Sequence, residues 1–499
     1  MLDAKDSVAT VHLSFRPGVT LANRDGVLVL THPRGEFVIG RVSPALSRAL
    51  DRLVRGPEDG DALADSVLAS DGTVADLARL LWLLDRLQAL LVRHVVSMGQ
   101  VMLSVTPMSL ANPARAVPVP DAGLLVLSRF ALCRRLAGQW VLESPLSAFR
   151  VTLHHQGAAS MISALAQPCS AADLEQAASD LFRPAVRAVL AELAAGGFLS
   201  GAGDQPGDIG GEASAEDRDR VLRQWDFHDL LFHMRSRLGR HDYPFGATFR
   251  FTGEFPALSA IKPPPPGDGI DLSVPRRDAT MRHDLTLLEA METRASIRTY
   301  GQRPMSADQL GEFLYRTARV RGTYGPFPEQ GMPYEASDRP YPTGGACYDL
   351  ELYALVNRCD GVSPAAYHYD PAGHRLHMVA DAAAGRPMFV MAALATGGAP
   401  PPDVLLIITS RFQRLSWKYQ SIAYATTLKN VGVLYQTFYL VATTMGLAPC
   451  ALGSGDSELA ARVLGLDPTV ESSVGDFMLG SRPEQVNAGR CGDWRLRFP

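Results

Sequence analysis

A polar, glycine-rich segment, GAGDQPGDIGGEASAE at residues 201–216, divides the sequence into two parts. It has too few apolar side chains to join a core, so it predicts a flexible linker. The chain has 499 residues, more than one compact core usually holds. We therefore expect separate folding units on the two sides of the linker. A proline run at 263–266 predicts a stiff connector within the second part.

The part before the linker shows the same order of predicted elements twice. The first copy has a hairpin signal around 23–26, a short helix at 43–56 and a longer helix at 74–92. The second copy has strands within 124–155 and helices at 157–167, 171–181 and 184–200. This order is typical of a small winged-helix-like domain. We predict two such domains, at residues 1–110 and 120–200.

A winged helix can bind DNA, bind a peptide along a strand edge, or support a dimer. The predicted helices carry mostly Leu and Ala, and the net charge of the chain is −4, so we expect no nucleic-acid partner. Peptide binding and a purely structural role are both compatible with the sequence.

Several classes of protein and site are disfavoured by the composition. The sequence has no uninterrupted apolar stretch of about 18 residues and no signal-peptide pattern at its start, which predicts a cytoplasmic protein without a membrane partner. The six cysteines form no CxxC pair, and the histidines lack metal-ligand spacing. We therefore expect neither a disulfide framework nor a metal site.

The part after the linker, residues 217–499, has a different character. A helical pattern at 217–239 is followed by alternating strand-like and helix-like segments, with a long helical stretch from Ser421 to Met445. This mixture predicts an α+β domain with a central sheet.

Three short motifs in this domain could hold a ligand. At 294–298, two arginines and a serine alternate, and in an extended chain they would point the same way and suit a phosphate. At 342–345, Pro-Thr-Gly-Gly precedes a strand and lets the backbone approach a ligand closely. At 451–453, Ala-Leu-Gly follows a helix that ends near Gly446 and could lie flat against a ring. Each motif alone also fits an ordinary turn or loop.

Together and in this order, the motifs resemble the FMN site of the nitroreductase superfamily. The resemblance is most specific to the SagB-type azoline dehydrogenases, which include the thiazoline oxidases of cyanobactin-like pathways. It is carried by collinear segments at 225–251, 294–300, 339–355, 365–377, 417–457 and 471–480. These oxidases are similar to this chain in carrying winged-helix domains related to leader-peptide recognition elements.

The resemblance implies a nitroreductase-like FMN-binding domain with a central mixed or antiparallel sheet, in a homodimer whose interface holds the cofactor. It implies that Arg294, Ser296 and Arg298 hold the FMN phosphate and ribityl chain, that Pro342, Thr343, Gly344 and Gly345 approach the flavin, that Gln436 lies near the ring, and that Ala451, Leu452 and Gly453 back the isoalloxazine. A further basic residue on the phosphate is Arg482 or Arg490.

The dipeptide Lys418-Tyr419 matches the Lys-Tyr pair that marks the azoline-oxidising branch. Azoline oxidation removes a proton from the α-carbon and a hydride from the ring CH2. FMN accepts the hydride, and a protein base must take the proton. Tyr419 is a candidate base if the Lys418 ammonium lowers its pKa, and Lys418 is the alternative base. A surface lysine beside a packing tyrosine is the structural alternative.

The resemblance therefore predicts an FMN-dependent dehydrogenase that converts peptide azolines to azoles during maturation of a ribosomally synthesised peptide. Its partners would be the azoline-containing precursor and a cyclodehydratase. One alternative is a flavin oxidoreductase that acts on another small molecule or peptide residue. The other is a degenerate flavin domain whose N-terminal part only recruits a peptide.

Overall fold

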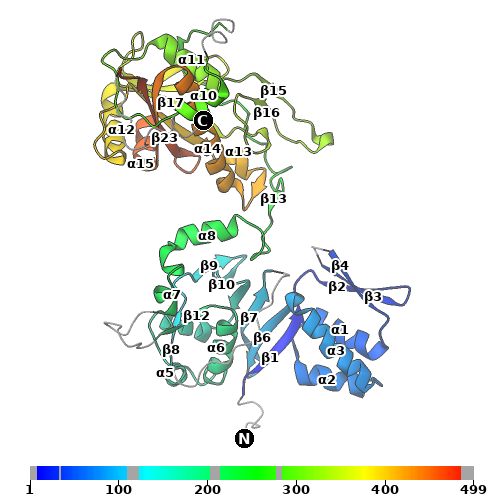
Figure 1. The fold of residues 1–499 in the computed structure, drawn as a ribbon. Helices are drawn as coiled ribbons and strands as arrows, with labels where there is room; N and C mark the ends of the chain where they lie inside the picture. The colour runs from blue at the N-terminus through cyan, green and yellow to red at the C-terminus, as the bar shows by residue number, and fades with distance from the viewer. Residues whose placement is uncertain (1–7, 33–34, 110–122, 203–213, 277–283, 485–499) are drawn as a thin grey trace, which may run out of the picture. The chain divides into compact units, whose positions relative to one another are not determined.

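The computed structural model describes residues 8–32, 35–109, 123–202, 214–276 and 284–484. The chain forms two compact units, Met1–Tyr243 (unit 1) and Pro244–Pro499 (unit 2). Figure 1 colours unit 1 from blue to green and unit 2 from green to red. Most of the predicted linker, residues 203–213, lies outside the described residues.

The boundary between the two compact units falls after Tyr243, whereas the sequence predicted it after residue 216. Contacts of residues 216–243 with the rest of unit 1 account for this difference. Glu216 accepts a hydrogen bond from the Ser128 hydroxyl at 2.7 Å, Tyr243 donates to Glu143, and Arg16 pairs with Asp242. The second half of the chain therefore begins at Pro244.

Unit 1 is built on a seven-stranded antiparallel sheet with the order β5-β1-β6-β7-β11-β10-β9. Its strands are β1 (Thr10–Phe15), β2 (Thr20–Arg24), β3 (Val27–His32), β4 (Gly35–Gly40), β5 (Glu58–Asp59), β6 (Leu91–Ser97), β7 (Gln100–Pro107), β8 (Leu124–Leu127), β9 (Leu132–Leu136), β10 (Gln139–Glu143), β11 (Phe149–Leu153) and β12 (Leu199–Ala202). Its helices are α1 (Pro44–Arg55), α2 (Gly60–Ala69), α3 (Val74–Arg86), α4 (Gln156–Ala164), α5 (Ala171–Ala177), α6 (Val186–Ala195), α7 (Ala215–Arg218) and α8 (Phe227–Arg235).

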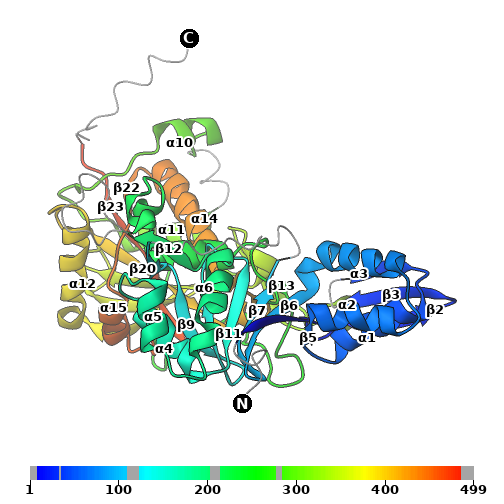
Figure 2. The ribbon, with the colours of Figure 1, turned by 90° about the horizontal axis from the view of Figure 1, so that it is seen from below.

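Each predicted copy in unit 1 has its own helices and its own apolar core. Helices α1–α3 pack beside β2–β4 in the first copy (Figure 2), and α4–α6 cover the core of the second. The large sheet nevertheless runs through both copies, because β7 pairs with β11. The predicted hairpin is confirmed, since Asp25 and Gly26 take the left-handed conformation between β2 and β3. The two separate winged-helix-like domains are not confirmed.

Unit 2 contains a second seven-stranded antiparallel sheet, with the order β14-β19-β18-β17-β20-β23-β22. Its strands are β13 (Gly246–Ala247), β14 (Ile270–Asp271), β15 (Gly322–Tyr324), β16 (Ala336–Asp338), β17 (Leu350–Val356), β18 (Ala365–Asp370), β19 (Arg375–Asp381), β20 (Val404–Arg411), β21 (Tyr419–Gln420), β22 (Leu447–Leu452) and β23 (Glu471–Ser481). Its helices are α10 (Leu287–Thr293), α11 (Ala307–Ala318), α12 (Ala382–Ala395), α13 (Gln413–Ser416), α14 (Ala423–Thr444) and α15 (Ser457–Leu464). The predicted α+β domain with a central antiparallel sheet is confirmed.

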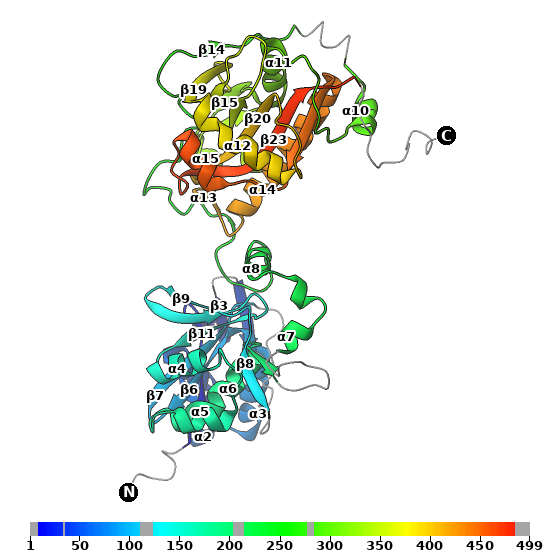
Figure 3. The ribbon, with the colours of Figure 1, turned by 90° about the vertical axis from the view of Figure 1, so that its left-hand side faces the viewer.

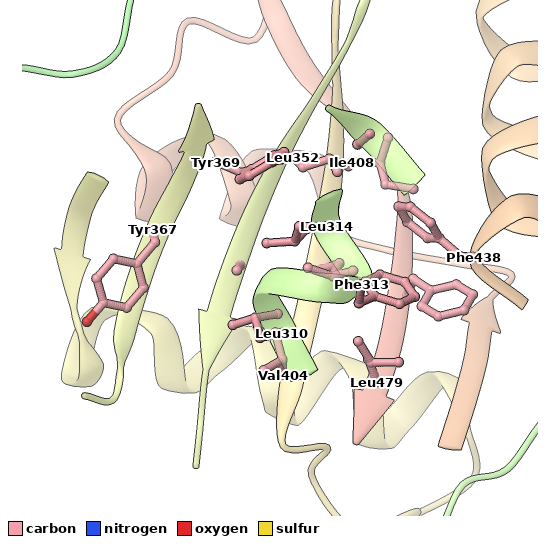
Figure 4. Close-up of a cluster of buried hydrophobic side chains, with 14 of the residues drawn as sticks. Leu310, Phe313, Leu314, Leu352, Tyr367, Tyr369, Val404, Ile408, Phe438 and Leu479 are labelled. Carbon is pink, nitrogen blue, oxygen red and sulfur yellow. The ribbon is translucent and has the colours of Figure 1, made fainter. Parts of the chain in front are cut away.

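Helices cover both faces of this sheet. Figure 4 shows Phe313 of α11 and Phe438 of α14 packed in the core on one face, with ring centroids 5.1 Å apart. Helices α12 and α15 contact each other (Figure 3), and their apolar side chains pack in the core on the other face. Every residue of β17 and β20 is consequently buried, as expected for strands covered on both sides.

No helix in the described part of the chain is both long enough and apolar enough to cross a membrane.

Candidate functional site

The segment after α10 presents the predicted phosphate-binding side chains. Ile297 is buried, and its N–H donates to the Pro449 carbonyl at 2.9 Å, which ties the segment to the middle of β22. Arg294, Ser296 and Arg298 are all exposed. Two guanidiniums and a hydroxyl are therefore available to an anionic group, as the alternating sequence predicts.

Tyr439 of α14 connects this segment to β22. Its hydroxyl lies 2.7 Å from the Ser296 hydroxyl and accepts the Ala451 N–H at 2.8 Å, and the Arg294 guanidinium lies 5.2 Å from its ring centroid. The sequence motifs do not include Tyr439. Its only sequence signal is its helical spacing of three residues from Gln436, which is exposed on the same helix.

The third motif lies at the end of β22. Leu452 is buried, Ala451 is half-buried and Gly453 is exposed, with no atom within 4 Å of the place where a Cβ would stand. Burial raises the pKa of the neighbouring Cys450 thiol, and the adjacent Arg298 only partly offsets this. The strand therefore presents small, uncharged groups beside the arginine segment.

The second motif is held by α14 through a buried polar chain. The Gly344 N–H donates to the Asn430 side chain at 3.2 Å, and Asn430 donates to Asp349 at 2.7 Å. Thr343 accepts the Tyr348 N–H at 3.2 Å, which makes it a structural member of the turn. Neither Asn430 nor Asp349 was a predicted site residue, because their pairing joins positions far apart in the sequence.

The sequence suggested that Gly344 and Gly345 let the backbone approach a ligand. In the structure, the space beside their Cα atoms is filled by protein side chains. A Cβ on Gly344 would overlap the Thr426 methyl group. A Cβ on Gly345 would overlap the Lys418 ammonium and stand 2.5 Å from the Tyr419 hydroxyl. Gly345 also has a φ of 62°, which favours glycine. The loop is therefore packed directly against the Lys-Tyr pair.

Lys418 lies in the turn that follows the short helix α13, and Tyr419 begins β21; this change of backbone direction lets both side chains reach Gly345. Lys418 is only 8% exposed, so the alternative of a surface lysine is wrong. Its Nζ donates to the Tyr334 hydroxyl and lies 4.3 Å from the centroid of the Tyr334 ring, 5.0 Å from that of Tyr419 and 5.8 Å from that of Phe249.

The pKa of Tyr419 is not lowered, although its candidacy as the base depended on that. Burial raises the pKa of Tyr419, and the opposing effects of the Lys418 charge and hydrogen bond are smaller. The hydroxyl of Tyr419 therefore stays protonated near neutral pH, which disfavours Tyr419 as the base.

Backbone strain is concentrated around this pair. Among the described residues, nine non-glycine residues have a positive φ, and four of them are Phe249, Ala346, Tyr348 and Ser421. All four lie in the segments that pack on or adjoin the Lys-Tyr pair and the Gly345 loop. Strained backbone of this kind is often kept where side chains must be placed for function.

The remaining predicted positions are less informative. Arg482 follows β23, with its carbonyl beside Gly301, whereas Arg490 lies outside the described residues. Within the described ranges, no group of three or more His, Cys, Asp or Glu side chains could hold a metal ion.

Comparisons with known proteins match both units. Residues 125–242 match the model of the cyanobactin oxidase ThcOx, and residues 291–481 match the model of the nitroreductase family. The putative nitroreductase MJ1384 of Methanocaldococcus jannaschii is 26% identical over 188 residues, which are 38% of this chain and 86% of that protein. The trifolitoxin-processing protein TfxB of Rhizobium leguminosarum bv. trifolii is 28% identical over 142 residues, 28% of this chain and 38% of that protein.

Solved structures give similar matches at low identity. A putative nitroreductase from Ralstonia eutropha is 19% identical with a TM-score of 0.34, over 46% of this chain and 98% of that one. A chain of the E. coli microcin synthetase McbBCD complex is 19% identical with a TM-score of 0.32, over 50% of this chain and 90% of that one.

Proposed function

Since this chain is a SagB-type member of the nitroreductase superfamily, we propose that it is an FMN-dependent dehydrogenase that oxidises peptide azolines to azoles. The observation that carries the proposal is the convergence of Lys418 and Tyr419 on Gly345. This pair lies in the same unit as the exposed arginine segment at 294–298. Unit 2 therefore contains both the residues proposed to bind the cofactor and those proposed to transfer the proton.

FMN is the cofactor of the nitroreductase family, and the residues of unit 2 fit its two ends. Arg294, Ser296 and Arg298 would hold the phosphate, because paired guanidiniums and a hydroxyl suit a dianion. Ala451, Leu452 and Gly453 would lie against the ring system, since the space beside Gly453 is open. When bound, FMN supplies an acceptor for the hydride from the azoline CH2.

The proton from the azoline α-carbon then has to be taken by the protein. Tyr419 remains protonated at neutral pH, so we assign the base to Lys418 and give Tyr419 the role of a hydrogen-bond donor beside it. Lys418 would accept this proton as a neutral amine, on a side chain that is only 8% exposed and surrounded by aromatic rings.

The substrate and partners follow from the same proposal. The match of residues 125–242 to a cyanobactin oxidase supports a peptide substrate, which unit 1 would bind, and a cyclodehydratase would supply the azoline. The exposed apolar side chains Leu287, Leu288 and Met291 on α10 support a homodimer. We expect the protein to act in the cytoplasm, without a nucleic-acid or membrane partner.

The proposal is tested with purified protein and a synthetic azoline-containing peptide. We expect flavin absorbance, FMN in the released cofactor, a dimeric mass in solution, and loss of two hydrogens per ring in the product mass. A colourless protein that takes up no FMN would end the enzymatic interpretation.

A flavin oxidoreductase acting on another small molecule or peptide residue is the second candidate, favoured by the similarity to a putative nitroreductase. A flavin-loaded protein that reduces nitroaromatic compounds and leaves thiazoline and oxazoline peptides unchanged would support this second candidate.

A further inference from the structure

Tyr334 is a buried residue that belongs to none of the three ligand-binding motifs. It is 7% exposed and lies just before β16. Its hydroxyl donates to the Gly345 carbonyl at 2.8 Å and accepts a hydrogen bond from the Lys418 Nζ. Tyr334 therefore joins the lysine to the backbone of the glycine loop.

The direction of these two hydrogen bonds is fixed by chemistry. A carbonyl oxygen can only accept, so the single proton of the Tyr334 hydroxyl is committed to Gly345. The Tyr334 oxygen can then only accept from Lys418. The chain of bonds runs from Lys418 through Tyr334 to Gly345, and it holds one N–H of the lysine in a defined direction.

Tyr334 acts in this chain as a neutral phenol. Burial, followed by the neighbouring Cys347 and Tyr324, raises the pKa of Tyr334 to about 12, although Arg414 opposes the shift. Its hydroxyl therefore keeps its proton at neutral pH and does not serve as the base.

The Lys418 box, formed by the rings of Phe249, Tyr334 and Tyr419, completes the arrangement. The Phe249 and Tyr334 rings stack with centroids 6.1 Å apart and planes 29° from parallel. Each ring of the box lies within about 6 Å of the Lys418 Nζ, the range in which an aromatic face attracts a cation. The Lys418 Nζ also lies beside Gly345, because a Cβ built on Gly345 would overlap it.

We propose that Tyr334 is a positioning residue for Lys418. Its hydroxyl oxygen accepts one N–H of Lys418 and so directs Nζ toward the space beside Gly345, where the amine would take the α-proton of the substrate. The part of this inference that concerns the reaction rests on the proposed azoline oxidation, whereas the Lys418–Tyr334 contact can be tested without it.

The kinetic test uses Tyr334→Phe, which removes the hydroxyl and keeps the ring of the Lys418 box. We expect kcat to fall about tenfold to a hundredfold, with KM and FMN content nearly unchanged. A loss of packing alone would also change KM or FMN content.

Tyr367→Phe is the matched control. Tyr367 is also buried and also donates to a backbone carbonyl, that of Ser363 at 2.9 Å, but it has no part in the proposed site. We expect the variant to keep the kcat and KM of the original protein.

The second readout is chemical and needs no enzyme activity. The chain has lysines only at positions 5, 262, 418 and 429, so acetic anhydride labelling can be followed at each one by peptide mass spectrometry. Lys429 is exposed and serves as the internal reference. We expect Lys418 to be acetylated more slowly than Lys429, and the difference to narrow in Tyr334→Phe but not in Tyr367→Phe.

Equal acetylation rates of Lys418 in the original protein and in Tyr334→Phe would show that the Tyr334 hydroxyl does not hold the lysine. A changed acetylation rate with an unchanged kcat would overturn the positioning role. If the original protein oxidises no azoline, the proposed function fails, and the acetylation experiment still decides whether Tyr334 holds Lys418.

Discussion

Substitution of Gly345 can show whether its contact with the Lys-Tyr pair matters beyond its backbone conformation. Its φ is positive, and an added Cβ would displace Lys418 and Tyr419. We predict that Gly345→Ala lowers kcat for azoline oxidation about a hundredfold, the scale for losing a positioned acid–base group. Gly331→Ala is the control, because Gly331 also has a positive φ but has no atom within 4 Å of its Cβ position. Equal losses in the two variants would attribute the effect to strain alone.

Lys418 and Tyr419 can be tested directly by removing their functional groups. We predict that Lys418→Ala and Tyr419→Phe each lower azoline oxidation about a hundredfold or more. FMN content should stay near normal, because neither residue belongs to the segments proposed to hold the phosphate or the ring. Product mass and flavin absorbance are measured together. Full activity in both variants would assign the pair to packing and favour the generic flavin oxidoreductase.

Asp476 on β23 carries a prediction about stability. Its side chain is 5% exposed, its Oδ2 would stand 2.6 Å from a Cβ on Gly455, and its Oδ1 has no hydrogen-bond partner within the described residues. Burial raises the pKa of Asp476 to about 7. An unfolded aspartate ionises near pH 4, so the folded state binds more protons between about pH 4 and 7. Stability should therefore fall as the pH rises through this window.

Removing this charge should flatten that pH dependence. We predict that Asp476→Asn is more stable than the original protein at pH 8, by about 1–3 kcal/mol, and nearly equal to it at pH 4. Urea unfolding at both values measures the difference, with the exposed Asp268→Asn as control. The same pH slope in Asp476→Asn and in the original protein would contradict the assignment.

At the residue scale, the sequence supports side-chain predictions where neighbours in the chain act together. The exposed triplet around the buried Ile297 and the Lys-Tyr pair are of this kind. Tyr334 and Tyr439 are not predictable in this way, because each has one hydrogen-bond partner more than eighty residues away. The condition under which Tyr419 would be the base, a lowered pKa, is not met, since the burial that raises its pKa is a property of the folded chain.

At the scale of elements, the arm of residues 244–259 that begins unit 2 supports the Lys-Tyr pair. The N–H groups of Thr248 and Phe249 donate to the Lys418 carbonyl at 3.0 and 3.1 Å. The Trp417 indole donates to the Phe255 carbonyl at 2.9 Å, and β13 in the arm pairs with β21. The arm also supplies Phe249 to the Lys418 box.

Two truncations test the arm. We predict that protein starting at residue 244 oxidises a short leaderless azoline substrate with nearly the original kcat. Protein starting at residue 260 should bind FMN but lose most of this activity, because the backbone support of Lys418 is missing. Equal kcat values in the two truncated proteins would show that the arm has no part in placing the pair.

Helices and turns that depend on a short sequence pattern were predicted correctly. The pairing of strands far apart in the sequence was not predicted. The turn at Asp25-Gly26 and the long apolar helix α14 follow from short-range patterns. The continuous sheet of unit 1 could not be anticipated, because the alternation within β7 and β11 does not say which strand each one will join. The sequence therefore reads as two domains where the structure has one compact unit.

At the scale of the whole molecule, the two units divide the work proposed for the enzyme. The proposed proton-transfer and cofactor residues are all in unit 2, and the match to a cyanobactin oxidase at 125–242 lies in unit 1. Unit 1 also contains a cavity of about 340 Å³ between α4 and the α5 region, lined mainly by small and apolar side chains. Such a division predicts that unit 1 contributes to affinity for the peptide and does not contribute to chemistry.

Comparison of two substrates on the protein that starts at residue 244 tests this division. We predict that KM for a full-length precursor rises about tenfold or more relative to the complete chain, while kcat changes little, because only uniform binding energy is lost. A leaderless azoline substrate should show the same KM with both proteins, since it has no segment for unit 1 to bind. A rise in KM for both substrates would mean instead that unit 1 shapes the catalytic unit. Unchanged precursor kinetics would leave unit 1 with a structural role, the alternative that its sequence also allows.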